Sequence, residues 1–244
     1  MDNLMLNGLA RQQTLRQAMD IAANNIANAS TNGFKAERLM LEASTNHDAR
    51  HSDGPDRIAF VSQWALGRDF SQGVLQRTER PLDLALDGEG FFALETENGE
   101  RFTRDGAFSL SSEGGLIASD GARVLDDAGQ PIFIDRAAGP ITVSETGIIS
   151  QNGAEVARVG VVRFEAPGLL SKTGLNRFEA PARAERAQDD LPRVRQGHVE
   201  GSNVRAINEI TTMMEVSRTY ASVSKMIRDA DELSRKAIDR IGRP

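Results

Sequence analysis

Several residue types are scarce in this chain of 244 residues. It has no cysteine, one tryptophan and one tyrosine, and aromatic residues make up 5% of it. Without cysteine, the chain forms neither a disulfide framework nor a thiolate metal site. With so few aromatic residues, the composition favours a modest core with peripheral helices over one thick core.

Long apolar runs and excess positive charge are also missing. No apolar stretch reaches membrane-spanning length, and the first residues lack the basic start and apolar run of a secretory signal, so we expect no membrane span and no cleaved signal peptide. The net charge of −6 argues against general nucleic-acid binding. Residues 41–200 carry 17 Lys+Arg and 26 Asp+Glu, net −9, which leaves +3 for the two ends.

The longest periodic stretch lies at the end of the chain, from Asn203 to Ile241. Apolar or small residues recur there in steps of three and four, which predicts one amphipathic helix with a seam for another helix. Such a helix would span roughly 58 Å, more than a small domain can cover. The seam residues predicted to form a subunit interface are Ile207, Ile210, Met213, Val216, Tyr220, Val223, Ile227, Ala230 and Ile241.

The first part of the chain, from Leu4 to Asn28, also has helical periodicity, on a face that narrows to alanine. Asn25 and Asn28 either hydrogen-bond across subunits or simply end this helix. The two terminal helices either pack on each other within one chain or use their apolar faces for assembly. The predicted interface residues of the first helix are Leu4, Leu9, Leu15, Met19, Asn25, Ile26 and Asn28.

Between the ends, the hydrophobic pattern changes to period two. Short strand-like runs from Val74 to Phe164 are separated by turn dipeptides such as Asp87-Gly88 and Asp105-Gly106, which predicts an all-β domain. We therefore expect an α+β fold in which paired N- and C-terminal helices form a coiled-coil arm, with the β domain inserted between them. The expected parts are a terminal helical domain (1–34 and 203–244), a connecting segment with an exposed loop at 44–57 (35–73), and the β domain (74–202).

Four candidate sites were weighed against simpler interpretations. Gly88 to Ala93 matches a nucleotide-binding fingerprint, but a strand-like run follows it where that fold requires a helix, so a hairpin is predicted. His47 and His51 have metal-ligand spacing in a loop-like context without a third ligand, and Ser71 with His198 makes a weak hydrolase pair. Acidic residues beside glycine usually form turns. No catalytic, metal or cofactor-binding residue is therefore predicted, and the candidate carboxylates for sugar chemistry stay an alternative: Asp83, Asp87 and Glu89.

Six motifs, in order along nearly the whole chain, resemble the bacterial flagellar axial proteins of the basal-body rod and hook family. The start of the chain, Met1 to Gln12, also resembles the proximal rod type more than the distal one. The length leaves room for one β domain, where hook proteins usually carry more. The motifs are Ala23–Asn28, Ser30–Lys35, Gln72–Leu75, Pro81–Phe92, Phe102–Phe108 and Glu200–Val204.

The resemblance implies a structural subunit of the proximal rod. Its terminal helices would line a helical tube that transmits torque from motor to hook, with other rod subunits and copies of itself as neighbours. It further implies export through the flagellar type III apparatus without a cleaved signal, and assembly in the periplasm. The alternatives are a distal rod or short hook-like subunit and, in another class, a carbohydrate-active enzyme or a cell-wall-binding module that uses the β domain.

Overall fold

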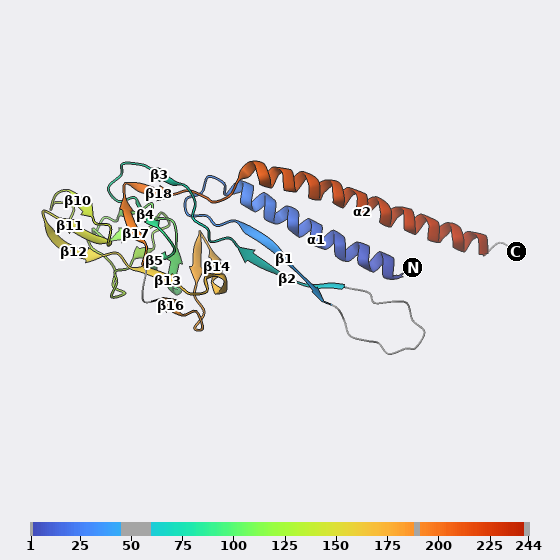
Figure 1. Cartoon of the computed structure of the whole chain (residues 1–244), viewed down its shortest axis with the longest axis horizontal. Helices are drawn as coiled ribbons and strands as arrows, with labels where there is room; N and C mark the ends of the chain where they lie inside the picture. Colours follow the sequence, from blue (N-terminus) through green and yellow to red (C-terminus); the bar gives the residue numbers. More distant parts are fainter. Residues whose placement is uncertain (1, 45–59, 188–190, 242–244) are drawn as a thin grey trace. The chain divides into compact units, whose positions relative to one another are not determined.

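The helical and strand-forming stretches of the sequence separate into two units (Figure 1). The computed structural model describes residues 2–44, 60–187 and 191–241, without side chains at 2–6, 41–44, 60–65, 234 and 237–241. Ser44, the first residue of the predicted loop at 44–57, ends a strand instead, whereas the rest of that loop and the candidate ligands His47 and His51 lie outside these ranges. The helical unit comprises residues 1–27, 37–69 and 205–244, and the β unit comprises residues 28–36 and 70–204.

Two long helices dominate the helical unit, α1 (Asp2–Ala27) and α2 (Ala206–Ile241). α1 consists largely of unbranched and small residues, which lose little side-chain freedom in a helix. α2 begins three residues later than the sequence indicates. The reason is that the Asn203 side chain, in the β unit, binds the backbone there: its Oδ1 accepts from the Ala36 N–H at 2.8 Å and its Nδ2 donates to the Ser71 carbonyl at 3.1 Å.

The helical unit also contains an antiparallel hairpin of β1 (Glu37–Ser44) and β2 (Phe60–Arg68). The sequence indicated only an irregular connecting segment there. The two strands pair in a register that sets Leu39 opposite Leu66. Because the two strands are far apart in the sequence, they do not show the pattern of two strand-like runs separated by a two-residue turn.

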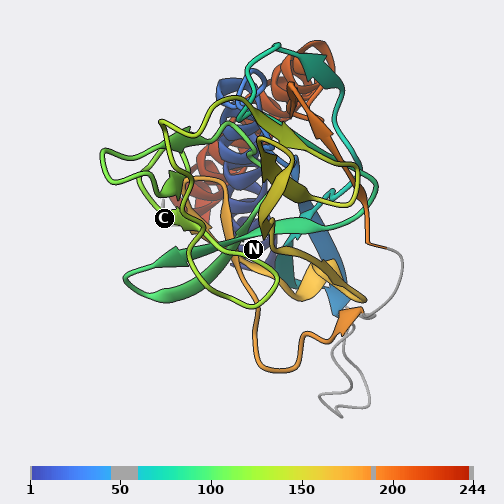
Figure 2. The same cartoon turned by 90° about the vertical axis from the view of Figure 1, so that its left-hand side faces the viewer.

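The β unit consists of short strands, consistent with the predicted all-β domain (Figure 2). The elements are β3 (Leu75–Arg77), β4 (Leu84–Asp87), β5 (Phe91–Thr96), β6 (Gly99–Thr103), β7 (Ser109–Leu110), β8 (Leu116–Ile117), β9 (Arg123–Val124), β10 (Ile141–Val143), β11 (Ile148–Gln151), β12 (Ala154–Arg158), β13 (Val161–Phe164), the 3₁₀ turn η1 (Pro167–Leu169), β14 (Ser171–Gly174), β15 (Arg177–Glu179), β16 (Arg186–Ala187), β17 (Arg193–Gln196) and β18 (His198–Glu200). β4 ends at Asp87 of the Asp87-Gly88 dipeptide, β6 begins at Gly99 after Asn98, and β11 and β12 flank Asn152-Gly153.

Strands this short are stable only when several pair and share a core. The main sheet has the order β14-β15-β6-β5-β9-β8-β7, and β13 joins it by pairing with both β5 and β16. Smaller sheets are formed by β10-β11-β12, by β17 with β4, and by β18 with β3. The last two pairs join strands more than 100 residues apart in the sequence, so the C-terminal part of the unit closes onto its beginning.

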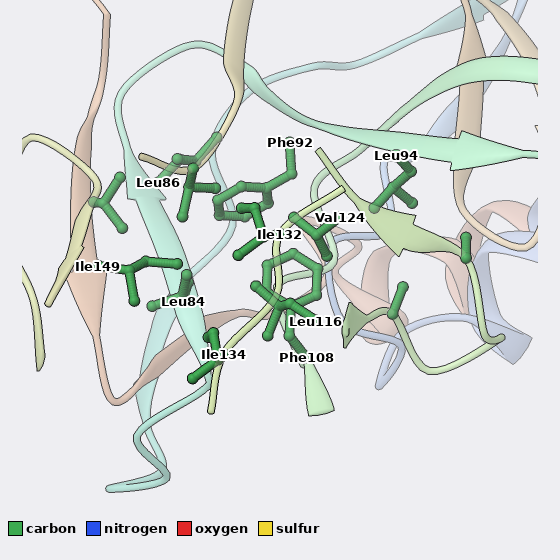
Figure 3. Packing of buried hydrophobic residues seen from close by; sticks show 14 residues of the cluster. Leu84, Leu86, Phe92, Leu94, Phe108, Leu116, Val124, Ile132, Ile134 and Ile149 are labelled. Carbon is green, nitrogen blue, oxygen red and sulfur yellow. The ribbon is translucent and has the colours of Figure 1, made fainter. Parts of the chain in front are cut away.

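Successive side chains of β5 point to opposite sides of its sheet and enter two different cores. Phe92 and Leu94 belong to the larger core, in which the Phe92 and Phe108 rings meet edge to face at 5.1 Å (Figure 3). Phe91 and Ala93 belong to a smaller, aromatic core on the other side. The central strand of the unit is therefore buried on both faces.

Two of the strand-like runs between Val74 and Phe164, at 156–164 and 132–134, were each expected to form one strand, and both expectations need correction. The predicted strand at 156–164 is divided into β12 and β13, because the Gly160 N–H turns to donate to the Leu125 carbonyl at 2.8 Å. The predicted strand at 132–134 makes only isolated bridges, although Ile132 and Ile134 are buried as its alternation requires. The strands from β14 onward lie beyond the strand-like runs that the sequence indicated, which ended at Phe164.

Candidate functional site

The two helices of the helical unit lie side by side with a defined register. The Gln12 side chain donates to the Ser224 hydroxyl at 2.7 Å. One turn earlier in α1, a Cβ atom at Gly8 would lie 2.8 Å from Ile227 Cγ1, so the helices approach closely because residue 8 has no side chain. Numbers rise along α1 as they fall along α2, so the pair is antiparallel, and α2 continues past the start of α1 (Figure 1).

Burial along α1 is uneven. Leu15 and Ala22 are buried, whereas Met19 and Ile26 are half-buried. Leu9 is 52% exposed. The predicted face of α1 is thus covered in its middle and open towards its first turns.

The apolar seam of α2 is only half-covered. Within the part of α2 whose side chains are described, 206–236 apart from 234, no residue is buried. The side chains of Leu4 and Ile241, also predicted for the interface, lie outside the described set. The half-buried seam residues are Met213, Val216, Tyr220, Val223, Ile227 and Ala230.

Further apolar side chains of α2 lie away from this seam. Nine residues separate Ile207 from Val216, which puts them on opposite sides of a helix with 3.6 residues per turn. Ile207 therefore points away from Val216, and Ile207 and Ile210 are 79% and 42% exposed. Three more exposed apolar residues belong to the same helix, which presents apolar surface in several directions: Met214 (48%), Met226 (57%) and Leu233 (67%).

A shallow apolar groove of about 220 Å³ runs between the two helices where they approach at Gly8. Its walls come from both helices, and Arg11 lies at its edge. A volume of this size matches one or two side chains rather than a small-molecule ligand, whose sites usually exceed 300 Å³. The lining residues are Asn7, Gly8, Arg11, Val223, Met226, Ile227 and Ala230.

Asn25 and Asn28 both have partners within the chain. Asn25 is 1% exposed, and its side chain binds the backbone of Glu37 twice: Nδ2 donates to the carbonyl and Oδ1 accepts from the N–H, each at 2.9 Å. Asn28 Oδ1 accepts from the Thr31 hydroxyl at 3.2 Å. Asn25 therefore attaches β1 to α1, and Asn28 stabilises the turn after the helix.

The β unit contains a second notable arrangement, three buried charged side chains that we call the Glu200 cluster: Lys35, Arg104 and Glu200. Lys35 Nζ lies 2.6 Å from Glu200 Oε1, and Arg104 Nη1 lies 3.0 Å from Oε2. The three side chains are 1%, 3% and 0% exposed. The Gly73 N–H also donates to Oε1 at 2.8 Å. Glu200 thus accepts three hydrogen bonds far from solvent.

With two cations and one carboxylate, the Glu200 cluster has a formal charge of +1. Two further donors bind carbonyls: Lys35 Nζ binds that of Ser71 and Arg104 Nη2 that of Gly88, each at 2.7 Å. Burial lowers the pKa of Arg104 below its usual value, and Glu200 opposes that shift. Arg104 Nε has no hydrogen-bond partner within the described ranges. Loss of Glu200 would leave two buried cations without compensation.

The segments around the Glu200 cluster are also joined through their backbones. The Gly33 N–H donates to the Glu200 carbonyl at 2.7 Å, and the Gly201 N–H donates to that of Val74 at 2.9 Å. A Cβ atom at Gly73 would overlap the Gly201 carbonyl, so only glycine fits. Here the structure brings together residues from five of the six motifs that carry the family resemblance.

The described residues of the other candidate sites make structural contacts and form no catalytic or ligand-binding arrangement. Gly88 and Gly90 have φ of 121° and 156° in the connection between β4 and β5. A strand follows the glycines, not the helix of a nucleotide-binding fingerprint. The predicted hairpin is wrong, however, because β4 pairs with β17, and β5 pairs with β6, β9 and β13. Ser71 Oγ accepts from Asn203 Nδ2 at 3.2 Å, and His198 Nδ1 lies 2.9 Å from the Gln196 carbonyl. Among the described residues, no group of three or more His, Asp or Glu side chains is arranged to hold a metal ion.

The three candidate carboxylates each lie beside a different arginine. The buried Asp83 accepts from Arg80 Nε at 2.8 Å. Asp87 accepts from Arg195 at 2.6 and 2.9 Å, and Glu89 lies 3.6 Å from Arg163. Each carboxylate is thus engaged in a separate ion pair.

Sequence reasoning did not find the Glu200 cluster. Its three members lie in separate motifs and look like ordinary surface charges. One signal was available: each stands within two residues of a glycine in a motif that resembles the family, at Gly33, Gly106 and Gly201. Such spacing allows the backbone to approach closely around a buried side chain.

Comparisons with known proteins agree along the whole chain. Three family models match: "Flagella basal body rod protein" at 5–35, "Flagellar hook protein FlgE/F/G D1 domain" at 85–151 and "Flagellar basal body rod FlgEFG protein C-terminal" at 195–240. The chain is 42% identical to the flagellar basal-body rod protein FlgF of Caulobacter vibrioides, covering 100% of this chain and 99% of that one. For FlgF of Rhizobium meliloti the identity is 33%, over 96% and 95%. For FlgG of Bacillus subtilis it is 29%, over 96% and 97%.

A terminal helix at each end, a β region between them and these matches define a structural protein of the bacterial flagellum. The chain belongs to the family of flagellar basal-body rod proteins, and within it to the proximal rod type. Its place is the flagellar basal body, and other rod subunits are its partners. No helix in the described ranges has both the length and the apolar character needed to cross a membrane.

Proposed function

We propose that this rod subunit polymerises through its terminal helices, with α1 and α2 paired as a coiled-coil arm. The observation that carries the proposal is the burial of α2: α1 lies along it, yet no described side chain of α2 is buried. Two helices alone bury too little apolar surface to be stable by themselves. Helices of neighbouring rod subunits, including copies of this chain, would cover what remains.

The proposed interface has two parts. Leu9, Val223 and Ile227 lie along the open end of the helix pair, and Ile207 and Met214 lie on the other side of α2. A subunit with apolar surface on several sides contacts more than one neighbour. Repeating such a contact without closure produces a helical tube, through which torque passes by contact alone.

The same proposal includes the route of assembly and the absence of catalysis. The subunit would be exported through the flagellar type III apparatus without a cleaved signal and would assemble in the periplasm. The lack of cysteine is compatible with passage through a conduit as an unfolded chain. A structural rather than enzymatic role is supported by the engagement of Asp83, Asp87 and Glu89 with separate arginines.

The test is the substitution Ile227→Asp in the full-length chain. It places a charge in the seam, where assembly would remove it from water without a partner. We expect Ile227→Asp to abolish incorporation into rods and swimming motility. The β unit should keep its wild-type amide hydrogen exchange, because Ile227 belongs to the helical unit.

The matched control is Ser222→Asp, which adds the same charge at an exposed position of the same helix. This control should assemble and swim normally. Normal rods with Ile227→Asp would overturn the seam as the assembly interface. Loss of motility with both variants would show that α2 does not tolerate charge anywhere, which also contradicts a specific seam.

A further inference from the structure

Phe133 is an aromatic side chain on the surface of the β unit. It is 54% exposed, whereas the flanking Ile132 and Ile134 are each 2% exposed and belong to the larger core (Figure 3). Because side chains alternate along an extended segment, Phe133 and Asp135 point outward together. Asp135 is exposed as well. The β unit thus presents an aromatic ring beside a carboxylate, on the side of the larger core.

An aromatic pocket of about 490 Å³ lies elsewhere on the β unit. Its walls include the rings of Phe70, Phe91 and Phe164, and Pro167 lines it too. Phe70 and Phe91 already meet edge to face at 5.6 Å. The volume lies within the range of pockets that bind ligands or side chains. This pocket could hold one more aromatic ring with its edge towards these faces.

The rim of the aromatic pocket carries charge. Arg163 lies there, 3.6 Å from Glu89, which is 77% exposed at its side chain. A guanidinium has five N–H donors, so Arg163 can bind a second carboxylate while it keeps Glu89. Arg104 of the Glu200 cluster also lines this pocket. The pocket therefore matches a ligand that combines an aromatic ring with a nearby acid.

The Phe133 ring and the aromatic pocket lie on opposite sides of the main sheet. Phe133 stands over the larger core, which receives Phe92 from β5. The pocket opens beside the smaller core, which receives the neighbouring Phe91. Adjacent residues of a strand point to opposite faces. Phe133 therefore cannot fill the pocket of its own chain.

We propose that Phe133 of one copy enters the aromatic pocket of a second copy, with Asp135 beside Arg163, so that β units associate head to tail. This inference rests on the proposed function, since it gives rod subunits a second contact outside their helices. Two different surfaces meet in it, so the contact is heterologous and leaves a free ring and a free pocket at the ends. Such a contact continues from copy to copy, as a rod requires.

The absence of native cysteine allows a direct test by disulfide crosslinking of full-length chains. One chain carries Asp135→Cys and the other Glu89→Cys, two exposed positions at the edge of the proposed contact. Both carboxylates near Arg163 are replaced, but the Phe133 ring and the phenylalanine side chains of the pocket stay unchanged, so the linkage reports on the aromatic contact. We expect mild oxidation of the mixture to give a linked dimer. Adding Phe133→Ala to the first chain should lower its yield about tenfold, as loss of a buried aromatic anchor does. Val156→Cys mixed with Glu89→Cys is the matched control for random collisions.

A yield no higher than that of the Val156→Cys control, or one that Phe133→Ala does not lower, would overturn the contact. Strong linkage of the Asp135→Cys chain to itself would overturn the head-to-tail arrangement, and linkage only to another rod protein in cells would overturn a second copy as the partner. The proposed function is tested separately by Ile227→Asp. If crosslinking fails while assembly still depends on Ile227, only the proposed contact between β units is contradicted, and the proposed function stands.

Discussion

The β unit and the helical unit differ in how much of its apolar surface each one buries within a single chain. Among the side chains that the structure describes, Leu15 and Ala22 are the only buried hydrophobic residues of the helical unit, and the others all lie in the β unit. The β unit also encloses three ions in the Glu200 cluster. The helical unit has longer elements but leaves their apolar faces half-covered.

This difference indicates that the β unit supplies most of the stability of the single chain, and that the helices serve assembly. Burial of apolar area is the main favourable term in folding, so the β unit should be stable as one chain. The helices bury a comparable share of their apolar area only when helices of neighbouring subunits cover the seam. Substitutions in the β unit should therefore affect folding, and substitutions in the helical unit should affect assembly.

The largest effect is expected for Phe92→Ala in the larger core. Phe92 is 0% exposed, and its truncation leaves a cavity beside Phe108, which should destabilise the β unit by about 3–5 kcal/mol. The single tryptophan and the single tyrosine both lie in the helical unit, so the change is best followed by hydrogen exchange of β-unit amides. Phe133→Ala, the same change at an exposed site, should stay within about 0.5 kcal/mol.

The next effect is expected for Glu200→Gln, which leaves Lys35 and Arg104 as buried cations without a carboxylate. We expect a loss of about 3 kcal/mol, measured in the same exchange experiment. Lys35→Met should cost less, because it removes one of the two cations and leaves a neutral pair of Arg104 and Glu200. If Lys35→Met destabilised the β unit more than Glu200→Gln does, the excess positive charge would not determine the stability of the Glu200 cluster. Glu155→Gln, at an exposed position of the β unit, serves as the neutral control.

Much of the fold could be predicted because its signals are local. The period of apolar residues defined both helices, and Asp-Gly and Asn-Gly dipeptides indicated the β region. The hairpin of β1 and β2 lacked the local pattern of two strand-like runs around a short turn, because its strands pair across a long connection. The strands from β14 to β18 were missed for the same reason: β17 and β18 pair with β4 and β3, more than 100 residues away.

The site was predictable only in its helical part. Seam residues such as Val223 and Ile227 follow from periodicity alone. The burial of Lys35, Arg104 and Glu200 depends on three segments meeting in space, and a charged residue in a sequence carries no mark of a distant partner. Asn25 was recognised as unusual on a packed helix, but its partner, the Glu37 backbone, lies in a hairpin that the sequence did not reveal.

A smaller effect is expected for Asn25→Ala, which removes two buried hydrogen bonds of the helical unit. The change leaves both backbone groups of Glu37 without their partners in a buried position, which should cost about 2 kcal/mol. Faster hydrogen exchange at the start of β1 would report the loss. Gln13→Ala, exposed on α1, should leave that exchange unchanged. An unaltered β1 in Asn25→Ala would show that the hairpin is held by other contacts.

The smallest effect is expected for Ile227→Ala in the dilute, unassembled chain. Such a truncation costs about 2–5 kcal/mol in a closed core, but Ile227 is only half-buried, and alanine regains about 0.4 kcal/mol of helix propensity. The helical unit should therefore lose about 1 kcal/mol, followed by tryptophan fluorescence during urea unfolding. A loss comparable to that of Phe92→Ala would mean that the seam is closed within one molecule. Neighbouring subunits would then have no apolar surface there to cover, and assembly would have to use the β unit alone.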